Sequence, residues 1–183
     1  MTKYLIIFRS LLLFFTFASF VQGSDLLSVG FWNIENLFDL ENDPNKRDDE
    51  FAIGGKKNVT RDIYELKIKR SVEVLTDLNV DILGLCEVEN ISVLKDLNND
   101  YKGRDYKIIH FDSPDERGID NALLYDQKKF SILASEAIEN RLGGNDKTRD
   151  ILYVKGIFLN TPLHIFVNHW PSNYGGKEQA IPK

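Results

Sequence analysis

Hydrophobic residues along the chain fall into short runs, and several of these runs end directly in a polar side chain. Three of them have the character of buried strands: Leu27–Trp32 before Asn33, Asp81–Cys86 before Glu87, and Leu163–Asn168 before His169. A buried carboxylate is costly unless it is paired or binds a metal, so the pattern makes Glu87 a candidate ligand. An amide, a carboxylate and an imidazole placed in this way predict one pocket at one edge of a sheet.

Apolar residues recur at helical spacing between the first two of these strands. Thr60 is suited to cap a helix, and the positions after it predict a helix over Arg61–Leu78. The residues that recur at helical spacing are Tyr64, Ile68, Val72 and Leu75. The polar stretch that precedes the helix, from Glu41 to Lys57, predicts a loop, and its charged part from Asp43 to Lys57 is most simply solvated.

Shorter hydrophobic runs predict the remaining elements. They are a short helix at Ile91–Leu97 and strands at Tyr106–Phe111, Asn121–Tyr125, Phe130–Ile138 and Ile151–Leu159. The mixture of strands and helices predicts an α+β fold. No internal repeat or linker marks a second domain.

The first 23 residues have the pattern of a secretory signal peptide. Lys3 and Arg9 flank the start of the apolar run Leu11–Val21, and Val21 and Gly23 are small residues suited to cleavage. We therefore expect a signal peptide over residues 1–23, a mature domain over residues 24–183, and a secreted or periplasmic protein. An uncleaved anchor is the alternative, but the run is short for a span of about 20 residues. No stable membrane span is expected after cleavage.

Composition and charge narrow the picture further. With 43% hydrophobic and 11% aromatic residues, 183 positions are enough for one globular core and exclude a disordered chain. Removing residues 1–23, which carry two basic and no acidic residues, lowers the formal charge from -5 to -7. A general basic coat for nucleic acid is absent, although a bound divalent cation and a few local Arg or Lys can still hold phosphate. The single cysteine, Cys86, is expected to be a small buried hydrophobe.

Together these residues form motifs that resemble the endonuclease/exonuclease/phosphatase superfamily. Its members include deoxyribonucleases, apurinic-site endonucleases, sphingomyelinases and inositol-polyphosphate phosphatases. The similar segments are Phe31–Leu37 (the opening Asn motif), Asp81–Val88 (the Glu motif), Val167–Ser172 (the central His motif), Arg117–Tyr125 and Thr148–Leu152. The resemblance extends from about Leu26 to Gly176.

The resemblance implies a partial four-layer α/β-sandwich, in which two packed β-sheets are flanked by helices and the C-terminal half is missing. The family's Gly-Asp-Phe-Asn and Ser-Asp-His motifs do not occur in the chain. The residues Lys177–Ala180 read as the first turn of a helix, and the chain stops at Lys183. We therefore expect a truncated product.

The resemblance also implies roles for individual residues in Mg²⁺-dependent hydrolysis, with Mn²⁺ as an alternative metal. The expected metal ligands are Glu87 and Asn33, the catalytic groups His169, Tyr125 and Asp120, and the substrate-binding residues Arg149, Arg117 and Asn168. Carboxylate and amide oxygens are hard ligands of the kind Mg²⁺ prefers. Each residue also has a simpler interpretation: Glu87 as a solvated acid, Asn33 as a turn cap, His169 as a structural histidine and Arg149 as a surface arginine. Glu89 is expected to be solvated and His164 structural.

The expected function is therefore metal-dependent phosphoester hydrolysis, most simply the cleavage of DNA or RNA. Two alternatives stay open. One is a phosphatase or sphingomyelinase-like phosphodiesterase of the same family, and the other is an inactive truncated fragment. No protein partner is indicated.

Overall fold

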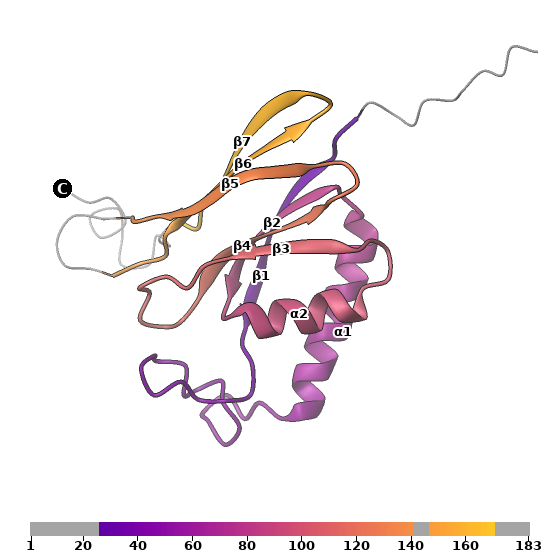
Figure 1. Cartoon of the computed structure of the whole chain (residues 1–183). Helices are drawn as coiled ribbons and strands as arrows, with labels where there is room; N and C mark the ends of the chain where they lie inside the picture. Colours follow the sequence, from indigo (N-terminus) through magenta and orange to yellow (C-terminus); the bar gives the residue numbers. More distant parts are fainter. Residues whose placement is uncertain (1–25, 141–146, 171–183) are drawn as a thin grey trace, which may run out of the picture.

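Two β-sheets packed face to face, with two helices on the outer face of the first sheet, make up the fold (Figure 1). The computed structural model describes residues 26–140 and 147–170. The predicted signal peptide and the predicted helical turn at Lys177–Ala180 lie outside this part. Within it, helices and two sheets form three successive layers, which confirms the predicted α+β sandwich of packed sheets.

The first sheet has four strands in the order β1-β2-β4-β3. Their bounds are Val29–Leu37 for β1, Ile82–Val88 for β2, Tyr106–His110 for β3 and Asp120–Asp126 for β4. β1 and β2 are parallel, whereas β4 is antiparallel to both β2 and β3. A parallel pair needs a long crossover, and the connection that contains the first helix supplies it.

The second sheet is antiparallel, in the order β5-β6-β7. Its strands are Ser131–Ile138 (β5), Ile151–Phe158 (β6) and Thr161–Val167 (β7). Six buried residues fill the space between the sheets: Ile82, Leu123, Phe130, Leu152, Val154 and Val167. Gly84 of β2 lets the sheets approach, because a Cβ there would lie 3.2 Å from a methyl group of Val167.

Both helices pack against the opposite face of the first sheet. α1 covers Arg61–Leu78 as predicted, and the Thr60 hydroxyl accepts a hydrogen bond from the Ile63 amide at 3.3 Å. α2 covers Ile91–Asp100 and therefore extends beyond the predicted Leu97. Among the described residues, no helix combines the length and the apolar character needed to cross a membrane.

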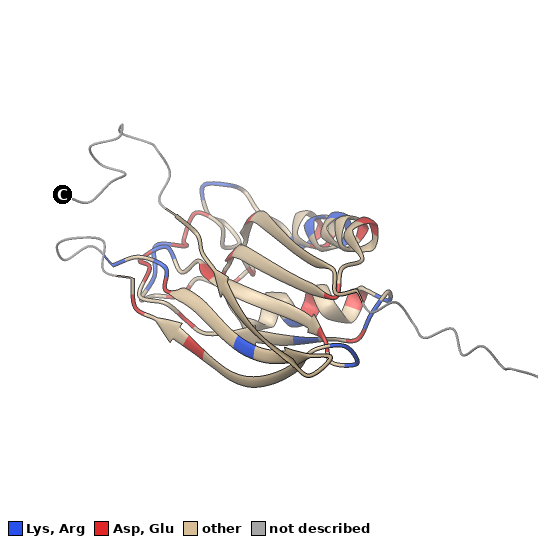
Figure 2. Cartoon of the chain, turned by 90° about the horizontal axis from the view of Figure 1, so that it is seen from above, with Lys and Arg blue, Asp and Glu red and all other residues tan. Residues whose placement is uncertain are grey.

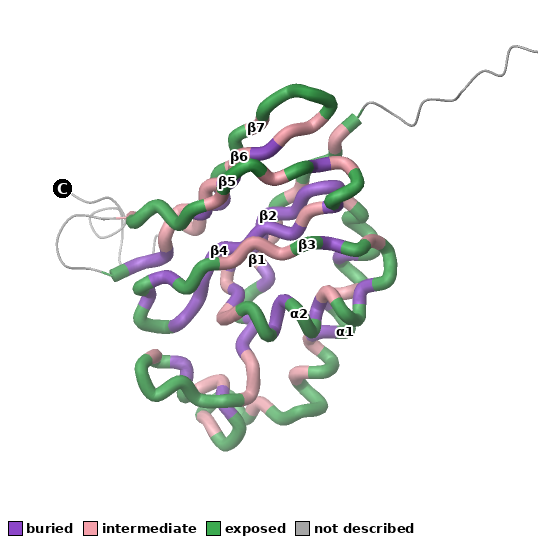
Figure 3. Tube along the Cα trace, viewed as in Figure 1, coloured by how far each residue is buried: buried purple, intermediate pink, exposed green. Residues whose placement is uncertain are grey.

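Burial follows this layering. Figure 3 shows buried residues concentrated in the central strands β2 and β4, and Figure 2 shows that the strands carry few charges compared with the loops and helices. Cys86 in β2 is 1% exposed, and burial raises the pKa of its thiol to about 12, as expected of a small buried hydrophobe.

The prediction of a solvated loop between Asp43 and Lys57 is wrong in part. Asp48 and Ala52 are only 1% and 7% exposed. The ring of Phe51 stacks on that of Phe38 with centroids 4.1 Å apart. The polar composition concealed the few side chains that anchor this segment to the end of β1.

Candidate active site

The structure brings Asn33, Glu87 and His169 together at one edge of the sandwich. Asn33 lies opposite Cys86 in the parallel β1-β2 pair, so the same edge of the sheet receives Asn33 and Glu87. The Asn33 side-chain amide donates to Glu87 Oε1 at 3.0 Å, and His169 Nε2 lies 3.3 Å from the same oxygen. His169 follows β7, so the site combines residues from both sheets.

Irregular backbone at the ends of β1 and β2 sets the direction of the Asn33 and Glu87 side chains. The β1-β2 register shifts between Asn33 and Leu37, and the β2-β4 register shifts between Cys86 and Val88. Glu35, Asn36 and Glu87 have φ angles of 59°, 61° and 63°. Left-handed conformations cost non-glycine residues roughly 1–3 kcal/mol each and gather at functional sites. Bulges of this kind redirect a side chain beside an active site, as the one at Glu87 does.

The oxygens of Glu87 and Asn33 suit a divalent metal ion. Glu87 Oε2 accepts from the Asn36 backbone amide at 3.1 Å, and Asn33 Oδ1 accepts from the Glu35 backbone amide at 2.8 Å. Each of these oxygens retains lone-pair capacity for a metal. One carboxylate and one amide oxygen fit Mg²⁺, which keeps several waters and takes further oxygens from a substrate phosphate.

His169 lies in an environment that favours its neutral form. Burial lowers the pKa of His169, the positive charge of Arg149 lowers it further, and Glu87 partly opposes both effects. Its Nδ1 is buried and has no hydrogen-bond partner in the described part of the chain. An imidazole that is neutral near pH 7 can form a hydrogen bond with a phosphoryl oxygen.

Arg149 contacts the chain itself. It donates through Nη1 to the Asp115 carboxylate at 3.2 Å and through Nη2 to the His169 carbonyl oxygen at 3.0 Å, and its side chain is 8% exposed. This buried guanidinium therefore fixes the backbone of His169. Arg117 lies 3.4 Å from Asp115, and because its side chain is 47% exposed it remains accessible to a phosphate.

Asp115 is a site residue that sequence reasoning missed. Its side chain is 5% exposed and pairs with both Arg117 and Arg149. The only sequence signal was its place in the turn cluster before Arg117. Nothing in the sequence links it to Arg149.

Asp120 and Asn168 lie near this edge, and their polar atoms are engaged within the chain. Asp120 opposes Val88 in the β2-β4 pair. Its carboxylate accepts from the Ser113 amide at 2.9 Å and lies 3.2 Å from His110 Nε2. The Asn168 side-chain amide donates to the Phe166 carbonyl oxygen at 3.3 Å.

The structure does not bring Tyr125, an expected catalytic residue, to this edge. Because β4 runs antiparallel to β2, Asp120 at its start lies near Glu87, while Tyr125 near its end pairs with Ile82. Tyr125 therefore lies at the opposite end of the sheet. Its ring packs edge-on against Phe130 in the core between the sheets.

The expectation that Glu89 is solvated is wrong. Its carboxylate accepts from the Asp39 backbone amide at 2.5 Å. Burial raises the pKa of Glu89 to about 8, and the nearby carboxylates of Asp39 and Asp48 add to the increase, against the effect of that hydrogen bond.

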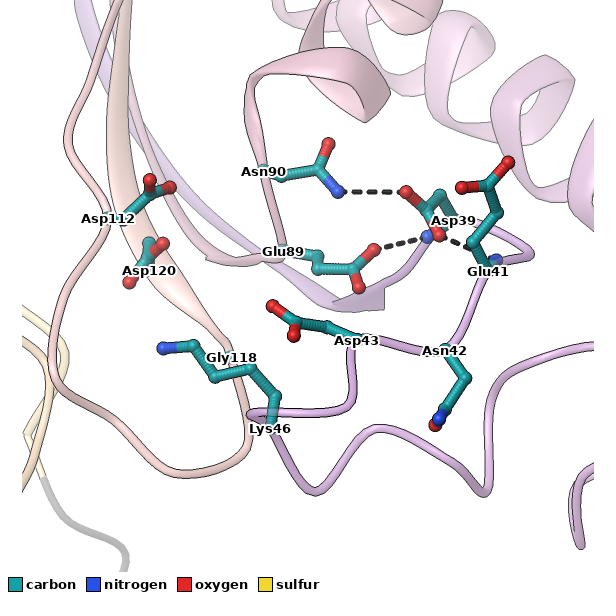
Figure 4. Close-up of a pocket in the computed structure, with 10 residues that line it drawn as sticks. All are labelled: Asp39, Glu41, Asn42, Asp43, Lys46, Glu89, Asn90, Asp112, Gly118 and Asp120. Atoms are coloured by element: carbon teal, nitrogen blue, oxygen red, sulfur yellow. Dashed lines mark hydrogen bonds between the residues drawn. The ribbon is translucent and has the colours of Figure 1, made fainter.

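Glu89 faces an acidic pocket of about 310 Å³, shown in Figure 4. Six carboxylates line it: Asp39, Glu41, Asp43, Glu89, Asp112 and Asp120. The ammonium group of Lys46 donates to the carbonyl oxygens of Ser113 and Asp115, each at 3.0 Å. Two of these carboxylates, Asp112 and Asp120, and His110 bring potential metal-ligating atoms within 4.8 Å of one another.

The sequence and the fold were compared with those of known proteins. Residues 28–183 match the model of the endonuclease/exonuclease/phosphatase family. No curated protein sequence matches the chain.

Solved structures that share the fold include the following three. TDP2 from D. rerio, complexed with a single-strand DNA product, has 17% identity and a TM-score of 0.52, covering 84% of this chain and 48% of that one. An endonuclease/exonuclease/phosphatase from Bacteroides vulgatus has 16% identity and a TM-score of 0.52, covering 79% and 52%. ANGEL2, a 2',3'-cyclic phosphatase, has 17% identity and a TM-score of 0.53, covering 80% and 41%. The chain thus spans about half the length of these proteins or less.

Proposed function

Because this chain belongs to the endonuclease/exonuclease/phosphatase family, we propose that its site acts in the metal-dependent hydrolysis of a phosphoester. The observation that carries the proposal is the convergence of Asn33 and His169 on one oxygen of Glu87. Hydrolysis of a phosphoester needs charge neutralisation at the phosphoryl oxygens and a positioned group that hydrogen-bonds them. These three residues offer both at one point.

Each side chain then has a distinct task. Glu87 and Asn33 would hold Mg²⁺ or Mn²⁺, which neutralises charge on the phosphoryl oxygens when bound. His169 would form a hydrogen bond with the phosphate, and the exposed guanidinium of Arg117 would bind a second phosphate oxygen. Arg149 acts as a positioning residue, because it holds the His169 backbone from inside the protein.

We propose nucleic acid as the substrate. Support comes from the structure of TDP2 from D. rerio with single-strand DNA, whose fold this chain shares. The exposed guanidinium of Arg117 beside the site suits a phosphodiester backbone even though the chain is acidic overall.

Substitution of the two central residues tests the proposal. In titrations with Mn²⁺, Glu87→Gln should lose binding at this site, while His169→Ala should retain it, because of these two residues only Glu87 supplies a metal ligand. Glu136→Gln, an exposed acid on β5, is the matched control and should behave as wild type.

Turnover gives the second measurement. DNA, RNA and a generic phosphodiester are assayed with the chain and with a version that includes any residues encoded after Lys183. Where turnover is present, each of the two site variants should lower it on the order of 100-fold or more. Unchanged turnover of His169→Ala on every substrate would contradict the role of His169. Metal binding with no turnover in either version would favour a non-catalytic protein.

We also propose that the protein is exported and that residues 1–23 are removed. The support is the charged and apolar pattern of these residues. Mass spectrometry of the N-terminal peptide from the periplasm or medium should give a start near Ser24. A protein that keeps Met1 and stays with the membrane fraction would contradict this proposal.

A further inference from the structure

A mostly apolar hollow, distinct from the acidic pocket, lies next to the edge that carries Asn33, Glu87 and His169. It is formed by the end of β1, the loop before α1 and the first turns of α1. We propose that this hollow seats a nucleobase of a nucleic-acid strand whose phosphate lies at Glu87. The inference rests on the proposed function and makes the substrate class more specific.

The hollow lies next to the proposed metal ligands. Glu35 and Asn36 line it. The Asn36 backbone amide donates to Glu87 Oε2 at 3.1 Å, and the Glu35 backbone amide donates to Asn33 Oδ1 at 2.8 Å. A wall of two residues therefore separates the hollow from the metal ligands, and both are exposed and have left-handed backbone conformations. A group attached to a phosphate at Glu87 would reach the hollow directly.

Its lining is suited to a single ring. The stacked rings of Phe38 and Phe51 form one side, and Val59 and Ile63 contribute aliphatic surface. Ile63 is 50% exposed although it lies next to this apolar hollow. The volume is about 270 Å³, slightly below the range of about 300–1,000 Å³ typical of pockets for drug-sized ligands. This size fits one nucleobase and leaves no room for a pair of lipid chains.

The charges on this side of the site are balanced, so they do not repel a phosphate backbone. Lys57 Nζ lies 5.4 Å from the centre of the Phe51 ring and only loosely contacts Glu50, at 4.0 Å. Lys67 Nζ donates to the carbonyl oxygens of Ile34 and Glu35 at 2.7 and 3.2 Å. These lysines balance the carboxylates of Glu35 and Asp39 in the lining.

The acidic pocket beside Glu89 presents the opposite case, since six carboxylates line it and would repel a phosphate chain. A strand that enters the site is therefore directed toward Lys57 and Lys67. Aromatic and apolar contacts with bases, combined with nearby cations, are the usual basis of single-strand recognition.

Binding measurements on the whole chain with Mg²⁺ test the inference. Adenosine 5'-monophosphate is compared with ribose 5-phosphate, which lacks the base, and with inorganic phosphate. The variant Ile63→Asp places a charge in the hollow. Leu66→Asp is its matched control, because Leu66 lies on the same helix, is 52% exposed and is not part of the hollow.

Adenosine monophosphate should bind wild type at least tenfold more tightly than ribose 5-phosphate. Ile63→Asp should remove this difference and leave ribose 5-phosphate binding unchanged, and Leu66→Asp should change neither. Val59→Asp, at another apolar residue of the lining, should repeat the effect of Ile63→Asp. Loss of binding in Glu87→Gln should be common to all three ligands.

Three results would overturn the inference. If adenosine monophosphate and ribose 5-phosphate bind equally and both depend on Glu87, the base has no seat, although the proposed function stands. If phosphocholine binds as tightly as adenosine monophosphate and responds to Ile63→Asp, the hollow serves a lipid headgroup. If no phosphate compound binds with Mg²⁺, the proposed function fails together with the inference.

Discussion

At the scale of single residues, Glu87 organises the site. Its carboxylate faces N–H groups of Asn33 and Asn36 and the imidazole of His169. No Lys or Arg ion pair with Glu87 occurs in the part of the chain that the structure describes. The negative charge is therefore satisfied by dipoles and stays available for a cation.

The titration of His169 is the first prediction. In the metal-free protein its pKa should lie below the ordinary value of about 6.5, because burial and Arg149 both disfavour the imidazolium form. Arg149→Met should raise this pKa by removing a positive charge, and Glu87→Gln should lower it by removing a negative one. The measurement is an NMR titration of the imidazole proton signals in the presence of EDTA. A fall in the pKa of His169 in Arg149→Met, or a rise in Glu87→Gln, would show that the charges act differently from this account.

Individual site residues differ in how well the sequence predicts them. Glu87 could be found because a hydrophobic run stops at a carboxylate, and burial at that point needs a reason. Tyr125 could not be placed, because its end of the sheet depends on the direction of β4. Arg149 could be assigned to this edge, but its use of Asp115 as a partner requires the three-dimensional structure.

At the scale of elements, Asp81, which directly precedes β2, links the segments before β1 and β5 and the loop before β3. Its buried carboxylate accepts from the amide and hydroxyl of Ser28 at 2.8 and 2.7 Å. It also pairs with Arg104 at 2.7 Å and Lys129 at 3.2 Å. Burial alone would raise the pKa of Asp81, but the Ser28 hydrogen bonds and these cations together lower it.

Asp81→Asn should therefore destabilise the fold at neutral pH, by about 3 kcal/mol, because it leaves partly buried cations with one partner fewer. A lowered carboxylate pKa stabilises the folded state above the unfolded pKa of about 3.9, and this contribution is lost as the pH falls through the folded pKa. The difference between wild type and variant should thus shrink below about pH 4. Urea unfolding at several pH values measures it, and a difference that grows toward acid would contradict the assignment.

Gly156 of β6 allows β5 and Phe130 to approach closely. A Cβ at this position would lie only 2.6 Å from the Ser131 carbonyl oxygen and would also overlap the Phe130 ring. Gly156→Ala should destabilise the protein by about 1–3 kcal/mol, as overpacking does in well-packed cores. Ala134→Val, at an exposed position of β5, is the control and should stay within about 0.5 kcal/mol of wild type in urea unfolding.

The sequence predicted the helices and strands better than it predicted the contacts between them. The bounds of α1 followed from the Thr60 cap and the spacing of its apolar residues, and both were confirmed. The irregular end of β1, which carries Glu35 and Asn36 at positive φ, left no signal in the sequence because non-glycine residues rarely adopt that conformation. Long-range packing holds this segment, and local preference does not reveal it.

At the scale of the whole molecule, the outer face of the second sheet carries an aromatic cluster. The Tyr153 ring lies 5.0 Å from that of Phe166 and 5.8 Å from that of His164. Phe166 is 54% exposed, and Leu133 on β5 is 55% exposed. Exposed apolar patches of this kind mark interaction surfaces or promote self-association.

Phe166→Lys should therefore reduce the self-association of the chain at high concentration, while Leu78→Lys, at an exposed position of α1, should not. Sedimentation velocity over a range of concentrations measures this effect. Equal self-association of wild type and Phe166→Lys would show that the aromatic cluster does not mediate the contact between copies of the chain.

The site draws Asn33 and Glu87 from one sheet and His169 from the end of the other. A ligand that touches all three can bind only while the two sheets remain docked, so it acts as a reversible clamp across the sandwich. By mass action such a clamp adds about 2.7 kcal/mol of stability at a concentration one hundred times its dissociation constant. The melting temperature therefore reports ligand binding without any measurement of turnover. Metals and phosphate compounds can be ranked by how far each raises the melting temperature of the protein.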